Sequence, residues 1–235
     1  MIDKIENKFD KLSNKFDFKG IFKPTLTSKL LINSSYKLLK KKQKVLDLGC
    51  GGGIISACLF EANKDSRYYL SDISKKAVLK AKKNLKNYNG NFYFKSGNGL
   101  EPWEGEKFDL IINDISGISS EVAKISPWFK NVPVDRSIDG TYLLSSTLKE
   151  VRKFMDKKSI IIFPIISLCN VEKAKTFLKK KFKILKRYEF EWPLPKQMLR
   201  HIDKLENLKK KKIVSYEKKY GIIICKTAII VAKKC

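Results

Sequence analysis

Residues 45–53 of the chain read VLDLGCGGG, a short apolar run followed by an acid and a cluster of glycines. The run predicts a buried strand, and the glycines allow a turn in which the backbone approaches a ligand closely. A second strand-like run, RYYLSD, ends roughly 20 residues further on in Asp72, whose carboxylate is placed to accept hydrogen bonds from a ribose. This spacing predicts a site for an adenosine-containing ligand at the carboxyl end of the first strand, with candidate residues Asp47, Gly49, Cys50, Gly51, Gly53 and Asp72.

The same loop narrows the chemistry of the ligand. The dinucleotide pattern G-x-G-x-x-G fails here, because its third glycine would fall on Ile54. A buried carboxylate at Asp47 would repel a pyrophosphate, whereas it suits a ligand that carries positive charge. S-adenosylmethionine has an ammonium, a sulfonium and a ribose, so it is the cofactor that these residues favour.

The elements that must position these residues follow a regular alternation of short apolar runs and amphipathic helices. That alternation predicts an α/β fold: a doubly wound, seven-stranded, mostly parallel sheet whose last two strands form an antiparallel hairpin. Ser74 is a good cap for the second of the helices that lie between the strands. The expected strands are 44–49, 67–72, 91–96, 108–114, 159–166, 182–195 and 220–234, and the expected helices are 55–61, 74–87, 142–155 and 171–180.

The chain length fits one domain with two additions. Residues 1–25 are expected to form a leading helix or arm, and residues 26–235 the domain itself. Residues 194–215 form a basic insertion between the last two expected strands. Its apolar residues have helical spacing, so it is either an amphipathic helix that contacts the substrate or a solvated surface helix: Met198, Ile202, Leu205 and Leu208.

Charge and composition bound the possible partners. With 50 basic and 24 acidic residues the net charge is +26, which favours an anionic partner such as RNA. Only five of the basic residues are arginine, and they are spread along the chain. Because bidentate phosphate and base recognition favours arginine, the charge supports RNA only modestly.

No apolar run reaches the roughly 20 residues that a membrane span needs. The charged N-terminus has no signal-peptide apolar region, so we expect a cytoplasmic protein without membrane association. The five cysteines are scattered and His201 is the single histidine, which favours neither a disulfide framework nor a metal site. The oligomeric state stays open.

The run VLDLGCGGG, combined with Asp72, resembles the first motif of class I S-adenosylmethionine-dependent methyltransferases. The resemblance covers residues 26–234 and implies a Rossmann-like methyltransferase fold with that cofactor. It also implies that Asn98 lies near the adenine amino group and that Ile73 packs on the adenine face. The alternatives are an ordinary turn asparagine and a buried residue at a strand end.

Three further stretches resemble one branch of that family. The run FDLII, residues 108–112, is similar to the lead-in to the N-P-P-Y tetrad of amino-group methyltransferases, which include the protein-glutamine N5-methyltransferases. FKPTLTSKLL, residues 22–31, resembles the branch's entry loop, which has a proline and a threonine before the first helix. The Asp139-Gly140 pair in residues 132–144 resembles its helix-opening segment. Together these stretches favour N-methylation over O-methylation.

The tetrad itself departs from the family pattern, since its four positions fall on Asp114, Ile115, Ser116 and Gly117. Asp114 fits as an acceptor that holds an N–H of the nucleophile, and Ser116 is the second catalytic candidate. Gly117 cannot stack on a planar acceptor as the family's aromatic residue does. Trp128 or Phe129 supplies the missing ring, or both are core aromatics.

The acceptor follows less directly from the sequence. The termination-factor enzymes carry a helical substrate domain before the catalytic one, whereas this chain has about 25 residues there. The leading hypothesis is transfer to a protein side-chain amide. The alternatives are an N-methyltransferase acting on an rRNA or tRNA base, a small-molecule methyltransferase and a non-catalytic cofactor-binding module.

Overall fold

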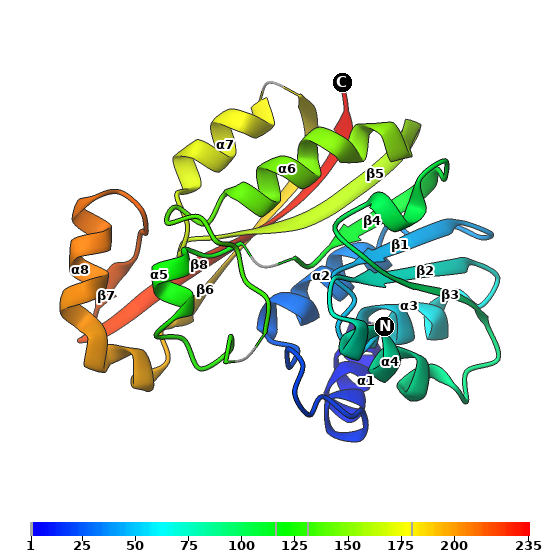
Figure 1. The fold of residues 1–235 in the computed structure, drawn as a ribbon, viewed down its shortest axis with the longest axis horizontal. Coiled ribbons are helices and arrows are strands. Elements are labelled where there is room, and N and C mark those ends of the chain that lie inside the picture. Colours follow the sequence, from blue (N-terminus) through cyan, green and yellow to red (C-terminus); the bar gives the residue numbers. More distant parts are fainter. Residues whose placement is uncertain (1, 116, 131, 180) are drawn as a thin grey trace.

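The structure is a computed structural model that describes residues 2–115, 117–130, 132–179 and 181–235. It is built around a mixed eight-stranded sheet in the order β3-β2-β1-β4-β5-β8-β6, with β7 paired to β8 (Figure 1). The strands are β1 (Lys44–Leu48), β2 (Arg67–Asp72), β3 (Asn91–Ser96), β4 (Phe108–Asn113), β5 (Met155–Ile166), β6 (Phe182–Pro193), β7 (Glu217–Lys219) and β8 (Ile222–Lys234).

The helices agree closely with the sequence periodicity. Ser74 caps α4 as expected, because its side chain accepts a hydrogen bond from the backbone N–H of Ala77. The α-helices are α1 (Ile2–Lys15), α2 (Leu26–Tyr36), α3 (Ile54–Ala62), α4 (Lys75–Leu85), α5 (Ser120–Ala123), α6 (Tyr142–Glu150), α7 (Val171–Lys179) and α8 (Ile202–Lys210). Short 3₁₀ segments are η1 (Glu101–Trp103), η2 (Val151–Phe154) and η3 (Lys196–His201).

The first five strands are parallel, and their register sets up the site. Leu48 at the end of β1 lies opposite Ser71 of β2 and Asn113 of β4. The next residue on each neighbour is Asp72 and Asp114, so the register brings two carboxylates to one edge of the sheet. A parallel sheet collects the ends of its strands in this way, and ligands bind there.

The antiparallel end of the sheet confirms the predicted fold class and adds one strand. β8 pairs antiparallel with both β5 and β6, as a closing antiparallel pair requires. The tight hairpin, however, joins β8 to β7, through Tyr220 and Gly221, which both have positive φ. β7 has the sequence Glu-Lys-Lys, so it carries no apolar pattern that would predict a strand.

Successive residues of the strands feed two separate cores. Val45 belongs to one hydrophobic cluster and Leu46 to the other, because side chains alternate across a strand. Helices α1 to α4 cover the first face, and α6 and α7 cover the second (Figure 1). Within the described residues, no helix has the length and apolar character needed to cross a membrane.

The N-terminal arm is a docked helix. Phe9, Leu12 and Phe16 on α1 are buried in the first core cluster, with α2 and α3. The residues between α1 and α2 therefore start from a fixed anchor.

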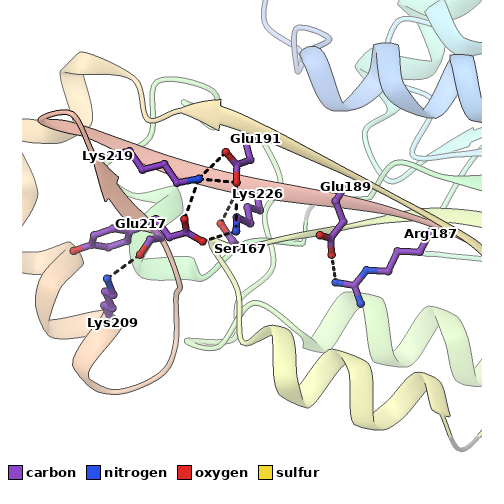
Figure 2. A network of polar contacts seen from close by, with 9 residues as sticks. Ser167, Arg187, Glu189, Glu191, Lys209, Glu217, Lys219 and Lys226 are labelled. Carbon is purple, nitrogen blue, oxygen red and sulfur yellow. Dashed lines mark hydrogen bonds and ion pairs between the residues drawn. The ribbon is translucent and has the colours of Figure 1, made fainter.

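The basic insertion forms a lobe with its own small core. Met198 and Leu205 are fully buried against the start of β8 and against α5. The predicted apolar stripe therefore faces protein, and the lysines of α8 face outward. Figure 2 shows the ion pairs on the adjoining strands, where Lys219 and Lys226 lie between Glu191 and Glu217.

Candidate active site

A cleft of about 1280 Å³ opens at the carboxyl ends of β1, β2, β4 and β5. Pockets that hold one drug-sized ligand usually measure roughly 300–1,000 Å³. This cleft is therefore large enough for a cofactor and an acceptor together. Its walls come from the glycine loop, the turns after β2 and β3, the loop after β4 and the segment before α2.

The glycine loop leaves the end of β1 with its backbone open to the cleft. Gly49 has a φ of +79°, and a side chain there would press on the backbone of Asp114 and Ile115 at 3.2 Å. Gly53 has a φ of +80° and precedes the first residue of α3. Both positions have the left-handed backbone conformation that favours glycine. Gly49 also packs closely against the strand end at Asp114.

Asp72 lies in the cleft with its carboxylate held by the backbone. Its two oxygens accept hydrogen bonds from the N–H of Gly51 at 3.0 Å and from the N–H of Ser74 at 2.9 Å. Burial raises the pKa of this carboxyl above its usual value. Each carboxylate oxygen keeps a second lone pair, so Asp72 can still accept hydrogen bonds from a ligand.

Asp47 lies beneath the loop, outside the lining of the cleft. It is completely buried, and its Oδ2 accepts hydrogen bonds from the Ser56 hydroxyl at 2.7 Å and the Ser56 N–H at 3.2 Å. Its Oδ1 has no hydrogen-bond partner among the described residues. Burial raises the pKa of Asp47 to about 6. Because Asp47 lies outside the lining of the cleft, its direct contact with a ligand stays a prediction.

Asp114 follows β4 and is half-buried in the cleft wall. Its Oδ2 accepts a hydrogen bond from the hydroxyl of Ser28, in the first turn of α2, at 2.8 Å. Burial is the main reason that its pKa rises to about 7, and the negative charges of Asp47 and Asp72 add to the rise. Ser116 falls outside the described residues.

The two residues expected beside an adenine line the turns after β2 and β3. Ile73 is 58% exposed, so it is not a buried residue at a strand end. Asn98 uses its amide to donate a hydrogen bond to the Glu101 carboxylate at 2.9 Å. Both side chains are accessible from the cleft, and their contact with a cofactor stays a prediction.

The loop after β4 is shaped by the Asp139-Gly140 pair. Gly140 has a φ of +66°, and a side chain there would meet the carbonyl carbon of Ile118 at 2.3 Å. Asp139 accepts hydrogen bonds from the N–H and hydroxyl of Thr141 and pairs with Lys173. The pair therefore presses the start of α6 against residues 118–119 and sets the path of that loop.

Aromatic side chains line the other half of the cleft. Phe129 packs on Phe22 with ring centroids 5.2 Å apart, and Trp128 packs edge-on against Trp192 at 5.6 Å. These rings are half-buried and line the same cleft as Asp114. Gly117 has open space where a side chain would lie. Trp128 and Phe129 also pack against the third hydrophobic cluster, so their role in place of the tetrad's aromatic residue stays a prediction.

A family model described as a methyltransferase domain matches residues 39–227. The chain belongs to this methyltransferase family. The matched region contains strands β1 to β7, the start of β8, the glycine loop, Asp72 and Asp114.

Curated relatives at modest identity fall in two groups. The release factor glutamine methyltransferase of Bacillus anthracis is 30% identical over 132 residues, which cover 53% of this chain and 47% of the relative. A ribosomal RNA small subunit methyltransferase B from Photorhabdus laumondii is 26% identical over 145 residues, covering 59% of this chain and 34% of that protein. The chain thus spans about half the length, or less, of the relatives it matches.

Solved structures share the fold across nearly the whole chain. A putative RNA methyltransferase from Pyrococcus horikoshii superposes with a TM-score of 0.60 at 16% identity, covering 99% of this chain and 98% of that one. A ribosomal protein L11 methylase from Lactobacillus delbrueckii gives a TM-score of 0.56 at 16% identity, covering 91% and 81%. These likenesses confirm the predicted Rossmann-like architecture.

Several residues of the methyltransferase site were not predicted from the sequence. Ser28 and Phe22 belong to the stretch FKPTLTSKLL, which was compared with the family only for its proline and threonine. Ser56, the partner of Asp47, lies in the apolar start of α3 and carries no motif. The signal for Ser28 was its place beside that threonine, but its contact with Asp114 joins residues 86 positions apart.

Proposed function

We propose that this methyltransferase uses S-adenosylmethionine and transfers its methyl group to a nitrogen acceptor, a protein side-chain amide in the leading case. The observation that carries the proposal is a group of three carboxylates at the strand ends: Asp47, Asp72 and Asp114. Their pKa values are all raised, and no ion pair involves them among the described residues. A cationic ligand offsets this unfavourable charge.

The residues present fit the cofactor. Asp72 offers free lone pairs for ribose hydroxyls, and the glycine loop brings bare backbone to the same wall. Ile73 offers an exposed apolar surface for an adenine ring. Asp47, with one unpartnered oxygen under the loop, adds negative potential for the ammonium and sulfonium. When bound, the cofactor supplies an electrophilic methyl group.

Asp114 is the group suited to the acceptor. A carboxylate in the cleft wall can accept a hydrogen bond from an acceptor N–H and so orient the nitrogen lone pair. With a pKa of about 7, it is partly ionised at neutral pH and can take the proton that an amide nitrogen loses on methylation. The Ser28 hydroxyl fixes the carboxylate through Oδ2.

The aromatic half of the cleft supports a planar acceptor. Flat amide groups and flat rings both pack well on aromatic faces, and the rings of Trp128, Phe129 and Trp192 are within the same cleft as Asp114. The relatives named for glutamine methylation favour the amide. Because those relatives extend well beyond the matched region, the protein substrate is a proposal for this chain.

The test combines cofactor binding with turnover. Asp72→Ala should abolish S-adenosylmethionine binding measured by calorimetry, because it removes the ribose acceptor. Asp114→Ala should keep binding but abolish labelling of acceptors when the protein and radiolabelled cofactor are added to a cell extract. Asp203→Ala, an exposed carboxylate on α8, is the control. Unchanged cofactor binding in both Asp72→Ala and Asp47→Ala would refute the proposal.

RNA base methylation is the second candidate, favoured by the net charge of +26. If RNA is the acceptor, its affinity should fall steeply with added salt, because phosphate contacts release counterions. If the labelled acceptor survives protease treatment but is destroyed by ribonuclease, the acceptor is RNA and not a protein amide. Undetectable or salt-independent RNA binding would remove it.

A further inference from the structure

Residues 16–28, which connect α1 to α2 and include the first turn of α2, run along the cleft and are called the strap below. Phe18, Phe22 and Ser28 of the strap all line the cleft. The strap begins at the buried ring of Phe16 and ends inside α2, so both of its ends are anchored in the first core cluster. It therefore joins the N-terminal helix to the methyltransferase site.

Asn84 on α4 links the strap to the glycine loop. Its Oδ1 accepts a hydrogen bond from the backbone N–H of Asp17 at 3.0 Å. Its Nδ2 donates to the backbone carbonyl of Gly52 at 3.0 Å. One side chain thus ties together two backbones that are distant in sequence, and the Asp17–Lys80 ion pair adds a second tie between the strap and α4.

Phe18 lies directly against the loop that Asn84 holds. A side chain built on Gly52 would come within 2.6 Å of the Phe18 ring and 3.2 Å of the Asn84 amide nitrogen. Gly52 is not among the glycines with positive φ, so its backbone does not itself require glycine. What requires a bare backbone at Gly52 is the strap.

The far end of the strap reaches the acceptor half of the cleft. Phe22 packs on Phe129 in the loop after β4, and Ser28 donates to Asp114 at 2.8 Å. Ser28 itself is 2% exposed, so its hydroxyl is committed to that carboxylate rather than to solvent. The strap thus contacts the glycine loop, the aromatic half and the catalytic candidate in turn.

We propose that Asn84 is a positioning residue that latches the strap onto the glycine loop and so holds the strap in place as a wall of the methyltransferase site. The latch sets the loop that binds the cofactor and carries the strap on to Ser28 and Asp114. The strap crosses residue 25, so the N-terminal arm and the domain from residue 26 share one site. This inference rests on the proposed cofactor, S-adenosylmethionine.

The first experiment measures S-adenosylmethionine affinity by calorimetry in Asn84→Asp and Asn84→Ala. Asn84→Asp keeps an acceptor for the Asp17 N–H but places an oxygen against the Gly52 carbonyl. Each variant should weaken binding about tenfold, the effect of one or two lost hydrogen bonds. Asn87→Ala, in the exposed turn after α4, is the matched control and should bind as the wild type does.

A double-mutant cycle then tests the strap itself. Gly52→Ala should weaken cofactor binding because the new methyl group collides with Phe18 and displaces the strap. Phe18→Ala should also weaken binding, since the wall is lost. If the strap covers the loop in solution, the double variant binds no more weakly than Phe18→Ala alone. Additive losses would overturn the proposal.

Hydrogen exchange separates this inference from the proposed cofactor. Without any ligand, Asn84→Ala should speed exchange at the Asp17 amide, which donates to Asn84, more than at amides within α4. A wild-type protein that does not bind S-adenosylmethionine would refute the proposed function, and the exchange result would still decide the latch. Wild-type binding with unchanged affinity and exchange in the Asn84 variants would refute the latch alone.

Discussion

The acidic side chains of the cleft and those of the C-terminal lobe, taken here together with the adjoining strands β6, β7 and β8, have opposite environments. At the cleft, Asp47, Asp72 and Asp114 are withdrawn from water, lack an ion pair among the described residues and have raised pKa values. In the lobe, Glu191 and Glu217 are exposed and have lowered pKa values, because lysines donate hydrogen bonds to them. Both sets carry the same chemical group.

The lobe's arrangement is an ordinary surface network. Lys219 contacts Glu191 at 3.0 Å and Glu217 at 3.1 Å, and Lys226 pairs with both (Figure 2). Lysines are plentiful in this chain, so exposed acids readily find one. The proposed cationic ligand would account for three carboxylates that have no lysine partner among the described residues, in a chain whose net charge is +26.

The largest effect should come from the core of the lobe, not from its charges. Leu205→Ala removes a completely buried side chain and should destabilise the protein by about 3 kcal/mol in denaturant unfolding. Cofactor affinity should stay unchanged, because the lobe packs behind the aromatic half of the cleft, whereas the glycine loop and Asp72 follow β1 and β2 (Figure 1). Leu199→Ala, on the exposed side of η3, is the control and should have little effect on either. Weakened cofactor binding in Leu205→Ala would join the two regions.

Asp47→Asn should have the opposite effect to Leu205→Ala, weakening cofactor binding without lowering stability. It keeps the side-chain shape but removes the buried charge, so S-adenosylmethionine binding should weaken about 100-fold, equivalent to about 2.7 kcal/mol. The cofactor-free protein should melt no lower than wild type at pH 7.5, since an uncompensated buried charge is lost. A lower melting midpoint together with wild-type affinity would mean that Asp47 is a structural residue.

The pH dependence of stability and of cofactor affinity should distinguish the cleft carboxyls from the exposed glutamates Glu191 and Glu217. Because the cleft carboxyls have folded-state pKa values above the unfolded value of 3.8, the folded state binds more protons between about pH 4 and 7. Their contribution to the stability of the cofactor-free protein therefore falls as pH rises through that window. Cofactor affinity should move the other way and be roughly tenfold weaker at pH 5.5 than at pH 7.5, because the cation needs ionised carboxylates.

The stability difference between wild type and Asp47→Asn isolates the buried carboxyl, since the surface charge is common to both proteins. That difference should shrink or change sign as pH falls from 7.5 to 5. The lowered pKa values of Glu191 and Glu217 place the loss of their stabilisation below 4.5, the usual glutamate pKa, as pH falls. Affinity that is constant from pH 5.5 to 7.5 would contradict the role of the cleft carboxylates.

The smallest effect should follow from neutralising the surface network. The double variant Glu191→Gln and Glu217→Gln keeps side-chain length while removing both negative charges. Its melting midpoint should match wild type within error at physiological salt, because water and ions screen exposed pairs. A large loss of stability would show that the network, and not the buried apolar face of α8, holds the lobe.

The parallel part of the fold was predictable from the sequence because its signals are local. Buried strands are continuous apolar runs, and Ser74 caps its helix within three residues of chain. The short strand β7 was not predicted, because its sequence Glu-Lys-Lys has no apolar pattern. Its strand conformation comes from pairing with β8 and from the Tyr220-Gly221 turn. Most of the predicted boundaries agree with the structure within one or two residues; β5, however, begins four residues earlier than expected, and the helix ending at Glu150 continues as the 3₁₀ segment η2.

The candidate site was predictable where one motif carries it. The sequence by itself determined the glycine loop, Asp72 and the methyltransferase family, because a turn and a strand end lie within a short stretch of chain. Only the tertiary structure decided that Asp47 lies under the loop, that Ser28 holds Asp114 and that Asn84 ties Asp17 to Gly52. Those contacts join residues from 32 to 86 positions apart, and side-chain packing, which no local pattern encodes, brings them together.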